Sequence, residues 1–180
     1  MTAVLFLTFA LICNVSSRVV VVQGAETAAF QAPRAEGEQH LDRLDQAKLE
    51  TLIHSRHGRA LFINVWATWC EPCVQEFPAI VKLARDMKGR KIDFVGVSGD
   101  YFSDESTKVI PFIQKENATF KFYIAKLEGE DAFINAFNPQ WGGGIPATFT
   151  YDSQGRLTSF LVGKQSYQHL KTAAEKALRR

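Results

Sequence analysis

Residues 60–73 read ALFINVWATWCEPC, an apolar run followed closely by the pair Cys70 and Cys73. The run over 61–66, broken only by Asn64, is typical of a central strand that is covered on both faces. Two thiols three positions apart at the start of a helix can close into a disulfide and reopen. The unpaired N–H groups and the dipole at the helix N-terminus stabilise the thiolate of the first thiol. The stretch therefore predicts a strand, a helix beginning at Cys70, and a thiol-disulfide redox centre.

Length and composition are those of an ordinary globular protein. The chain has 180 residues, of which 46% are hydrophobic and 22% charged, so one domain with a sizeable core is expected. The formal net charge is only +2, and lysine and arginine are scattered without a basic run. A phosphate-binding stripe is thus missing from the sequence, and nucleic acid is not expected as a partner.

An apolar segment opens the chain. Residues 3–12 have the length of the hydrophobic region of a signal peptide. We expect residues 1–24 to be a signal peptide or, because no lysine or arginine precedes the apolar run, an uncleaved membrane anchor. Residues 25–40, rich in alanine, glutamate and glutamine, predict a flexible linker, which leaves 41–180 for the folded domain. The expected location is periplasmic or otherwise extracytoplasmic, with or without a membrane tether.

The cysteine spacing indicates catalysis rather than structural support. Removing the leader removes Cys13 and leaves only Cys70 and Cys73. A structural disulfide stabilises mainly by closing a long loop, and a bridge between residues three apart closes almost none. We therefore expect Cys70, at the exposed helix end, to be the nucleophile, and Cys73, one turn deeper, to be the resolving thiol.

The rest of the chain alternates between strands and helices before a final hairpin and helix. Apolar periodicity and turn residues predict strands over 61–66, 92–97, 120–124, 147–151 and 157–162, and helices over 41–57, 70–89, 104–117, 130–137 and 166–178. Alternation followed by an antiparallel hairpin predicts an α/β fold with a mixed central sheet and helices on both faces.

Several motifs fall in an order that is known from one superfamily. Residues 65–73, with Pro78 five positions after the second cysteine, resemble the active-site segment of the thioredoxin superfamily. Residues 144–146, Gly155 and residues 162–163 follow in the order that this superfamily uses for its cis-proline loop and final hairpin. The resemblance covers roughly the whole expected domain.

Two features narrow the resemblance to one branch. Glu76, three residues after Cys73, and the extra helix and strand over 104–124 are similar to the TlpA-like and ResA-like thiol-disulfide oxidoreductases of bacterial cell envelopes. This resemblance implies that residues 41–180 form a thioredoxin-like three-layer α/β/α sandwich, with a mixed central sheet and an inserted helix-strand unit.

The superfamily also implies a substrate site. Its cis-proline faces the two sulfurs and exposes the backbone of the preceding residue to pair with an extended substrate. The resemblance therefore implies a cis bond between Ile145 and Pro146, with substrate contacts from these two residues and from Trp69, Glu71 and Pro72. Trp69 frames the sulfurs in this interpretation.

Acidic residues surround the cysteine pair. Glu71 places negative charge near the Cys70 thiolate, which keeps the pKa of that thiol from falling far and favours a reductant over an oxidant. Glu76 shares a helix face with Cys73 and can reach its thiol directly or through a water, unless it is only a solvated surface charge. Asn64 stands where cytosolic thioredoxins carry a proton-transferring aspartate. The resemblance suggests that Glu76 shares that task, while Asn64 is alternatively a packed strand residue.

The resemblance implies an enzyme that reduces protein disulfides by dithiol-disulfide exchange. It requires no cofactor and takes electrons from a separate membrane or envelope donor. A subset of the branch reduces the haem-attachment cysteines of apocytochrome c. The alternatives are a thioredoxin-like binding module with an idle disulfide and a peroxide reductase, although the motif lacks the threonine and arginine that activate a peroxide. A zinc site that adds His54 and His57 to the cysteines is disfavoured, because histidines near helix ends are common on surfaces, and no metal is expected.

Overall fold

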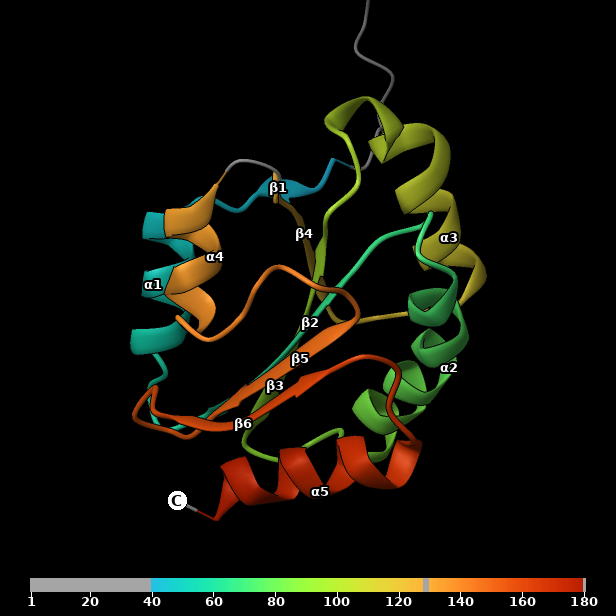
Figure 1. Ribbon diagram of the computed structural model, residues 1–180. Coiled ribbons are helices and arrows are strands. Elements are labelled where there is room, and N and C mark those ends of the chain that lie inside the picture. Colours follow the sequence, from blue (N-terminus) through green and yellow to red (C-terminus); the bar gives the residue numbers. More distant parts are fainter. Residues whose placement is uncertain (1–39, 128–129, 180) are drawn as a thin grey trace, which may run out of the picture. The chain divides into compact units, whose positions relative to one another are not determined.

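The computed structural model describes residues 40–127 and 130–179 (Figure 1). The leader expected over 1–24 and the linker expected over 25–40, apart from His40, lie outside the described residues. Within the described ranges, no helix combines the length and the apolar character needed to cross a membrane.

In the described part of the chain, six strands form one mixed sheet in the order β1-β4-β3-β2-β5-β6. The first four in that order run parallel to one another, whereas β5 is antiparallel to β2, and β6 to β5. Every residue of β2 and of β5 is buried, as expected for strands covered on both faces. The strands are β1 (Asp42–Arg43), β2 (Ala60–Trp66), β3 (Ile92–Ser98), β4 (Lys121–Ile124), β5 (Ala147–Tyr151) and β6 (Leu157–Val162).

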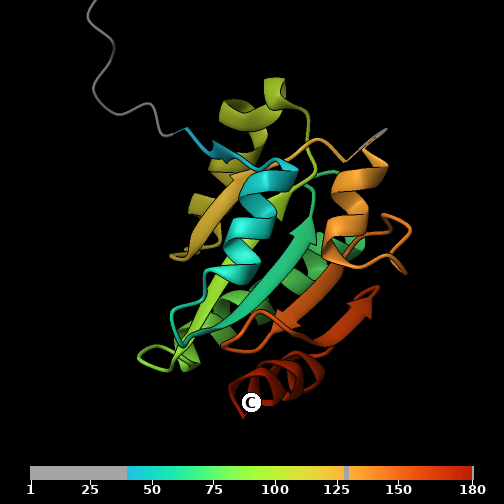
Figure 2. The same cartoon turned by 90° about the vertical axis from the view of Figure 1, so that its left-hand side faces the viewer.

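Helices cover both faces of this sheet, and side-chain alternation along β2 shows how. Ile63 and Val65 point into a core shared with α1 and α4, whereas Phe62 points into a core shared with α2 and α5. The predicted three-layer sandwich with a mixed sheet is confirmed. Figures 1 and 2 show α1 (Gln46–His54) and α4 (Asp131–Phe137) on one face, and α2 (Glu71–Asp86), α3 (Ile110–Lys115) and α5 (Tyr167–Leu178) on the other.

The first helix is shorter than its periodicity predicts. Residues expected to open a helix at position 41 instead form β1, which pairs in parallel with β4. Asp45 then caps α1, because its side chain accepts a hydrogen bond from the backbone N–H of Lys48 at 2.8 Å. The strand partner lies far along the chain, so local periodicity does not reveal it.

The inserted unit begins irregularly. Instead of the single helix predicted over 104–117, the chain forms a 3₁₀ turn (Phe102–Asp104), a π-helical turn (Glu105–Val109) and then α3. The Asp104 side chain makes no capping hydrogen bond. Pro111 accounts for the wide turn, because proline offers no N–H and crowds the carbonyl four residues earlier. The N–H of Ile110 bonds to the C=O of Glu105 instead.

Candidate active site

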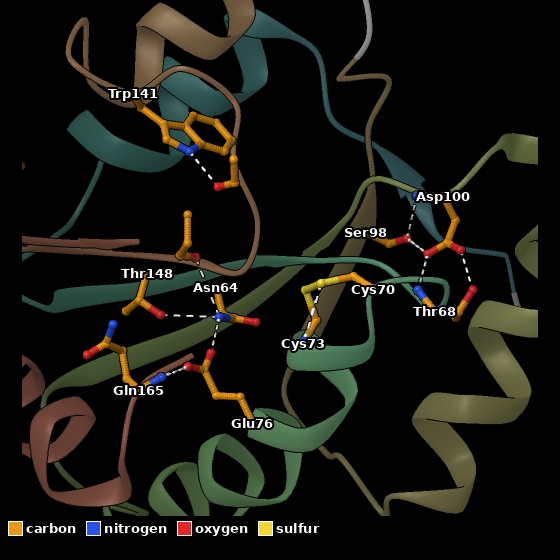
Figure 3. Close-up of a disulfide and its surroundings, with 12 residues drawn as sticks. Asn64, Thr68, Cys70, Cys73, Glu76, Ser98, Asp100, Trp141, Thr148 and Gln165 are labelled. Atoms are coloured by element: carbon orange, nitrogen blue, oxygen red, sulfur yellow. Dashed lines mark hydrogen bonds between the residues drawn. A yellow bond between two sulfur atoms is a disulfide. The ribbon is translucent and has the colours of Figure 1, made fainter. Parts of the chain in front are cut away.

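Cys70 and Cys73 form a disulfide at the N-terminus of α2 (Figure 3). A tight turn follows β2, in which the N–H of Cys70 donates to the C=O of Ala67 at 3.2 Å. Cys70 is the N-cap of α2, and Pro72 lies in the first turn, where its missing N–H costs no helical hydrogen bond. The backbone N–H of Cys73 donates to Sγ of Cys70 at 3.3 Å. The helix end therefore supplies a donor to the sulfur that is expected to become the thiolate.

The disulfide is less accessible than the sequence predicts. Cys70 is only 6% exposed and Cys73 2%, so Cys70 is the more accessible residue of the pair but is itself buried. Both belong to an apolar cluster with Trp66 and Phe77, and Ile145 packs against this cluster. These side chains come from several elements, and their packing buries the bridge. Of the two cysteines, Cys70 is thus slightly closer to the protein surface.

Exposed residues surround the buried bridge. Trp69, in the turn before Cys70, is 63% exposed, and Glu71 and Pro72 are exposed in the first turn of α2. The Glu71 carboxylate accepts a hydrogen bond from Nε2 of Gln75 at 2.8 Å, along the helix surface. These three side chains are available to a partner molecule. Trp66, by contrast, is fully buried.

The loop before β5 carries the expected cis-proline. The bond between Ile145 and Pro146 is cis, and Pro146 is buried. The indole Nε1–H of Trp141 donates to the C=O of Gly144 at 2.9 Å and holds this loop (Figure 3). Gly143 has φ of 79°, a left-handed conformation that glycine adopts readily. The Trp141 hydrogen bond thus holds the loop that brings Ile145 to the cysteine cluster.

Glu76 is buried rather than solvated, with 2% of it exposed. Its Oε1 accepts a hydrogen bond from Nδ2 of Asn64 at 3.1 Å, and its Oε2 accepts from the backbone N–H of Gln165 (Figure 3). Burial raises the pKa of Glu76 above its ordinary value, and the hydrogen bonds from Gln165 and Asn64 oppose that rise. Asn64 also donates to Oγ1 of Thr148 at 3.2 Å. The structure thus brings together Asn64 and Glu76, which the resemblance had linked.

Three polar residues of this site were missed by sequence reasoning. Asp100 binds the turn before the cysteines, Trp141 holds the cis-proline loop, and Gln165 binds Glu76 through its backbone. Asp100 lies beyond the strand predicted over 92–97, and nothing in its local sequence links it to residue 68. The position of Trp141 directly before three glycines was a usable signal. Glycines have no side chain, so an indole N–H beside them can donate only to their backbone carbonyls. Gln165 contributes its backbone, so its residue type carried no signal.

Metal ligands do not gather in the described ranges: no three histidine, cysteine, aspartate or glutamate side chains of 40–127 and 130–179 are placed to hold an ion together. The cysteines that a zinc site would need are joined in the disulfide. Nδ1 of His54 lies instead beside Gly155, in the turn between β5 and β6.

A mixed sheet of this order, with a cysteine pair opening α2 and a cis-proline loop before β5, defines a thiol-disulfide oxidoreductase with a thioredoxin-like fold. More particularly, the chain belongs to the Redoxin family, which matches residues 27–177.

Individual relatives agree with this assignment. Thiol-disulfide oxidoreductase ResA of Geobacillus thermodenitrificans is 24% identical over 89% of this chain and 80% of that protein. Thioredoxin-like protein YneN of Bacillus subtilis is 28% identical over 66% of this chain and 65% of its own. A solved thiol:disulfide interchange protein of Chlorobium tepidum TLS superposes with a TM-score of 0.57 at 27% identity, covering 69% of this chain and 83% of that one. The protein is therefore a thiol-disulfide oxidoreductase.

Proposed function

We propose that this protein is an exported reductase of protein disulfides that acts through Cys70 and Cys73, and that its substrates include the haem-attachment cysteines of apocytochrome c. The observation that carries the proposal is the disulfide itself, with Cys70 capping α2 and the more deeply buried Cys73 one turn further. Similarity to proteins named ResA supports thiol-disulfide chemistry. The apocytochrome substrate rests on the resemblance to the envelope branch alone.

The reaction is a pair of thiol-disulfide exchanges. The thiolate of reduced Cys70 attacks one sulfur of the substrate disulfide, the substrate S–S bond breaks, and a mixed disulfide forms. Cys73 then loses its proton and attacks Sγ of Cys70, which releases the substrate as a dithiol. Two electrons pass from enzyme to substrate, and the Cys70–Cys73 disulfide is the oxidised product. A separate dithiol donor of the membrane or envelope restores the reduced pair.

Residues around the disulfide supply the contacts with the substrate in this proposal. We assign substrate contacts to exposed Trp69, Glu71 and Pro72 and to the cis-proline loop at Ile145 and Pro146. The backbone of Ile145, before the cis bond, is the element that pairs with an extended substrate.

Glu71 favours reduction of the substrate over its oxidation in this proposal. It stands in the first turn of α2, where its negative charge opposes stabilisation of the Cys70 thiolate by the helix end. A less stabilised thiolate means a more stable disulfide, and hence a reductant.

Catalytic turnover separates this proposal from a binding module. The reduced protein, regenerated by excess dithiothreitol, is expected to reduce insulin disulfides over many cycles, well above the rate with dithiothreitol alone. The double variant Cys70→Ser/Cys73→Ser is the control and should match the donor alone. Absence of turnover by the parent would leave a binding module with an idle disulfide, and preferential consumption of hydrogen peroxide would favour a peroxide reductase.

Export is tested with the leader. Residues 1–40 fused to alkaline phosphatase, which matures only outside the bacterial cytoplasm, are expected to give active phosphatase, because disulfides form and persist there. Fractionation then distinguishes a cleaved signal peptide, which releases the fusion, from an anchor, which keeps it in the membrane. An inactive fusion confined to the cytoplasm would contradict export.

A further inference from the structure

Asp100 is a buried carboxylate just beyond β3, the strand beside the one that leads to the cysteines. Only 2% of it is exposed. Strands β2 and β3 run parallel, with Trp66 opposite Ser98 at their ends. The loops that follow these strands, residues 67–69 and 99–101, therefore leave the sheet side by side. We call the first of them, residues 67–69, the cysteine turn.

The Asp100 carboxylate binds the cysteine turn with both oxygens (Figure 3). Its Oδ2 accepts from the backbone N–H of Thr68 at 2.9 Å, and its Oδ1 accepts from the Thr68 hydroxyl. The Ser98 hydroxyl donates to Oδ2 at 2.7 Å, and the N–H of Asp100 donates back to that hydroxyl at 3.1 Å. The carboxylate thus holds the residue two positions before Cys70 and is itself held by β3.

The negative charge at this place requires an explanation. Among residues 40–127 and 130–179, no lysine, arginine or histidine forms an ion pair with Asp100. Burying an unpaired carboxylate is costly, and only its hydrogen bonds offset that cost. Packing alone would favour an uncharged side chain here. The charge is better explained by the hydrogen bonds to Thr68. A carboxylate accepts strong hydrogen bonds at both oxygens and donates none.

We propose that Asp100 is a positioning residue for the exchange reaction, which fixes the cysteine turn through Thr68 and thereby places Sγ of Cys70 at the N-terminus of α2. The N–H of Cys70 closes the turn on the C=O of Ala67, so the turn encloses the residue that Asp100 binds. Fixing the turn keeps Cys70 in the N-cap position, where the N–H of Cys73 meets its sulfur. The inference rests on the proposed function, in which Cys70 is the attacking thiol.

Two variants separate the charge of Asp100 from its grip on the turn. Asp100→Asn removes the charge. It also leaves a single acceptor oxygen for the Thr68 and Ser98 donors, which in the parent protein bind both carboxylate oxygens. Loss of the negative charge lowers the Cys70 thiol pKa, whereas loosening of the turn raises it, so the shift in this variant is the sum of two opposed effects. Thr68→Val keeps the charge but removes the hydroxyl contact, so the turn loosens and the pKa of Cys70 is expected to rise. Because Thr68 acts through Asp100, its effect should shrink in the Asp100→Asn background.

The experiment measures the alkylation rate of Cys70 by iodoacetamide against pH in the reduced full-length protein, with the modified residue identified by mass spectrometry. The midpoint of each curve reports the Cys70 thiol pKa. Cys73, Glu71 and Glu76, the other titratable groups near the sulfur on α2, remain unchanged in every variant. In parallel, kcat/KM for insulin reduction by Asp100→Asn is expected to fall about tenfold, the effect of losing one hydrogen bond to a charged group.

Asp152→Asn is the matched control. Asp152 is also a fully buried carboxylate that holds a turn, accepting from the backbone N–H groups of Gln154 and Arg156. Unlike Asp100 it also pairs with Nε of Arg156 at 2.7 Å, and it lies after the end of β5 that pairs with Leu61, away from the cysteines. It should lower the melting temperature and leave the Cys70 midpoint at the parent value.

Distinct results overturn the inference and the proposed function. A Cys70 midpoint that stays at the parent value in both Asp100→Asn and Thr68→Val, or that moves equally in Asp152→Asn, overturns the role of Asp100. If Asp100→Asn fails to fold, the Thr68→Val midpoint decides alone. Preferential alkylation of Cys73 in the parent protein would instead defeat the proposed function, since Cys70 would not be the attacking thiol.

Discussion

Cys70→Ser is expected to abolish disulfide reduction, whereas Cys73→Ser is expected to accumulate mixed disulfides with substrate. Attack and resolution are separate steps on separate sulfurs. Without the Cys70 thiol there is no nucleophile, and without the Cys73 thiol the mixed disulfide is not resolved. The burial of the pair agrees with this order, because only 2% of Cys73 is exposed and Cys70 is the more accessible residue. Non-reducing gels and mass spectrometry of cell extracts measure the trapped species, and insulin turnover measures the loss.

The trapped species also tests the substrate. Apocytochrome c held through a haem-attachment cysteine on Cys70 of the Cys73→Ser variant would support that part of the proposal. Cys13→Ser, in the expected leader, is the matched control and should leave insulin turnover unchanged. Equal alkylation rates of Cys70 and Cys73 at neutral pH would contradict the division of roles.

Glu76→Gln is expected to slow resolution of the mixed disulfide by about a hundredfold, at the lower end of what a general base contributes. Cys73 must lose a proton to attack, and Glu76 is a buried carboxylate one helical turn away with its pKa raised by burial. In the parent, resolution should slow as the pH falls through that raised pKa, because a protonated Glu76 accepts no proton. The Glu76→Gln variant should lack this decrease in rate at low pH. Single-turnover release of substrate, measured against pH, tests both expectations.

Stability provides a second measure of the same group. A carboxyl pKa raised in the folded state contributes stability below its unfolded value, and that contribution is lost as pH rises through the folded pKa. As the pH rises from the ordinary glutamate pKa to the raised pKa of Glu76, the free energy of unfolding of the parent should therefore decrease. The free energy of unfolding of Glu76→Gln should not change with pH for this reason. At neutral pH the two should differ by no more than about 1 kcal/mol.

The control for Glu76→Gln is Glu50→Gln on α1, an exposed carboxylate hydrogen bonded to Gln46 on the opposite face of the sheet. It should retain the parent's pH-rate profile. If Glu76→Gln retains that profile too, the proton leaves Cys73 by another route and Glu76 is a packing residue.

Local patterns were sufficient to predict most of the fold. The buried strands matched closely because a continuous apolar run is itself the signal, as over 61–66, and the final hairpin over 147–162 matched at both strands. The last helix, predicted over 166–178, begins where Ser166 caps α5 by accepting from the N–H of His169. Two predicted helices were wrong in part. The helix over 41–57 begins late because residues 42–43 pair with a distant strand, and the helix over 104–117 is irregular because a proline widens one turn.

The site was predictable only as far as its chemistry is local. The spacing of Cys70 and Cys73 and the proline at 146 are visible in sequence, and the cis bond before Pro146 is confirmed. The surroundings of Glu76 depend on an amide from β2 and a backbone N–H just before α5, which no local window contains together. The burial of Cys70 likewise depends on side chains from several elements.

The pairing of β2 with β5 makes the site a late product of synthesis. A ribosome produces Cys70 and Cys73 long before it produces the hairpin, whose first strand carries Thr148, the partner of Asn64. Gln165, which binds Glu76, follows after the hairpin. Contacts between such distant segments form only after a long loop has closed. Until then, the nascent chain carries a cysteine pair without the groups that surround it. The surroundings of the cysteine pair are therefore complete only once the final hairpin has joined the sheet and Gln165 has reached Glu76.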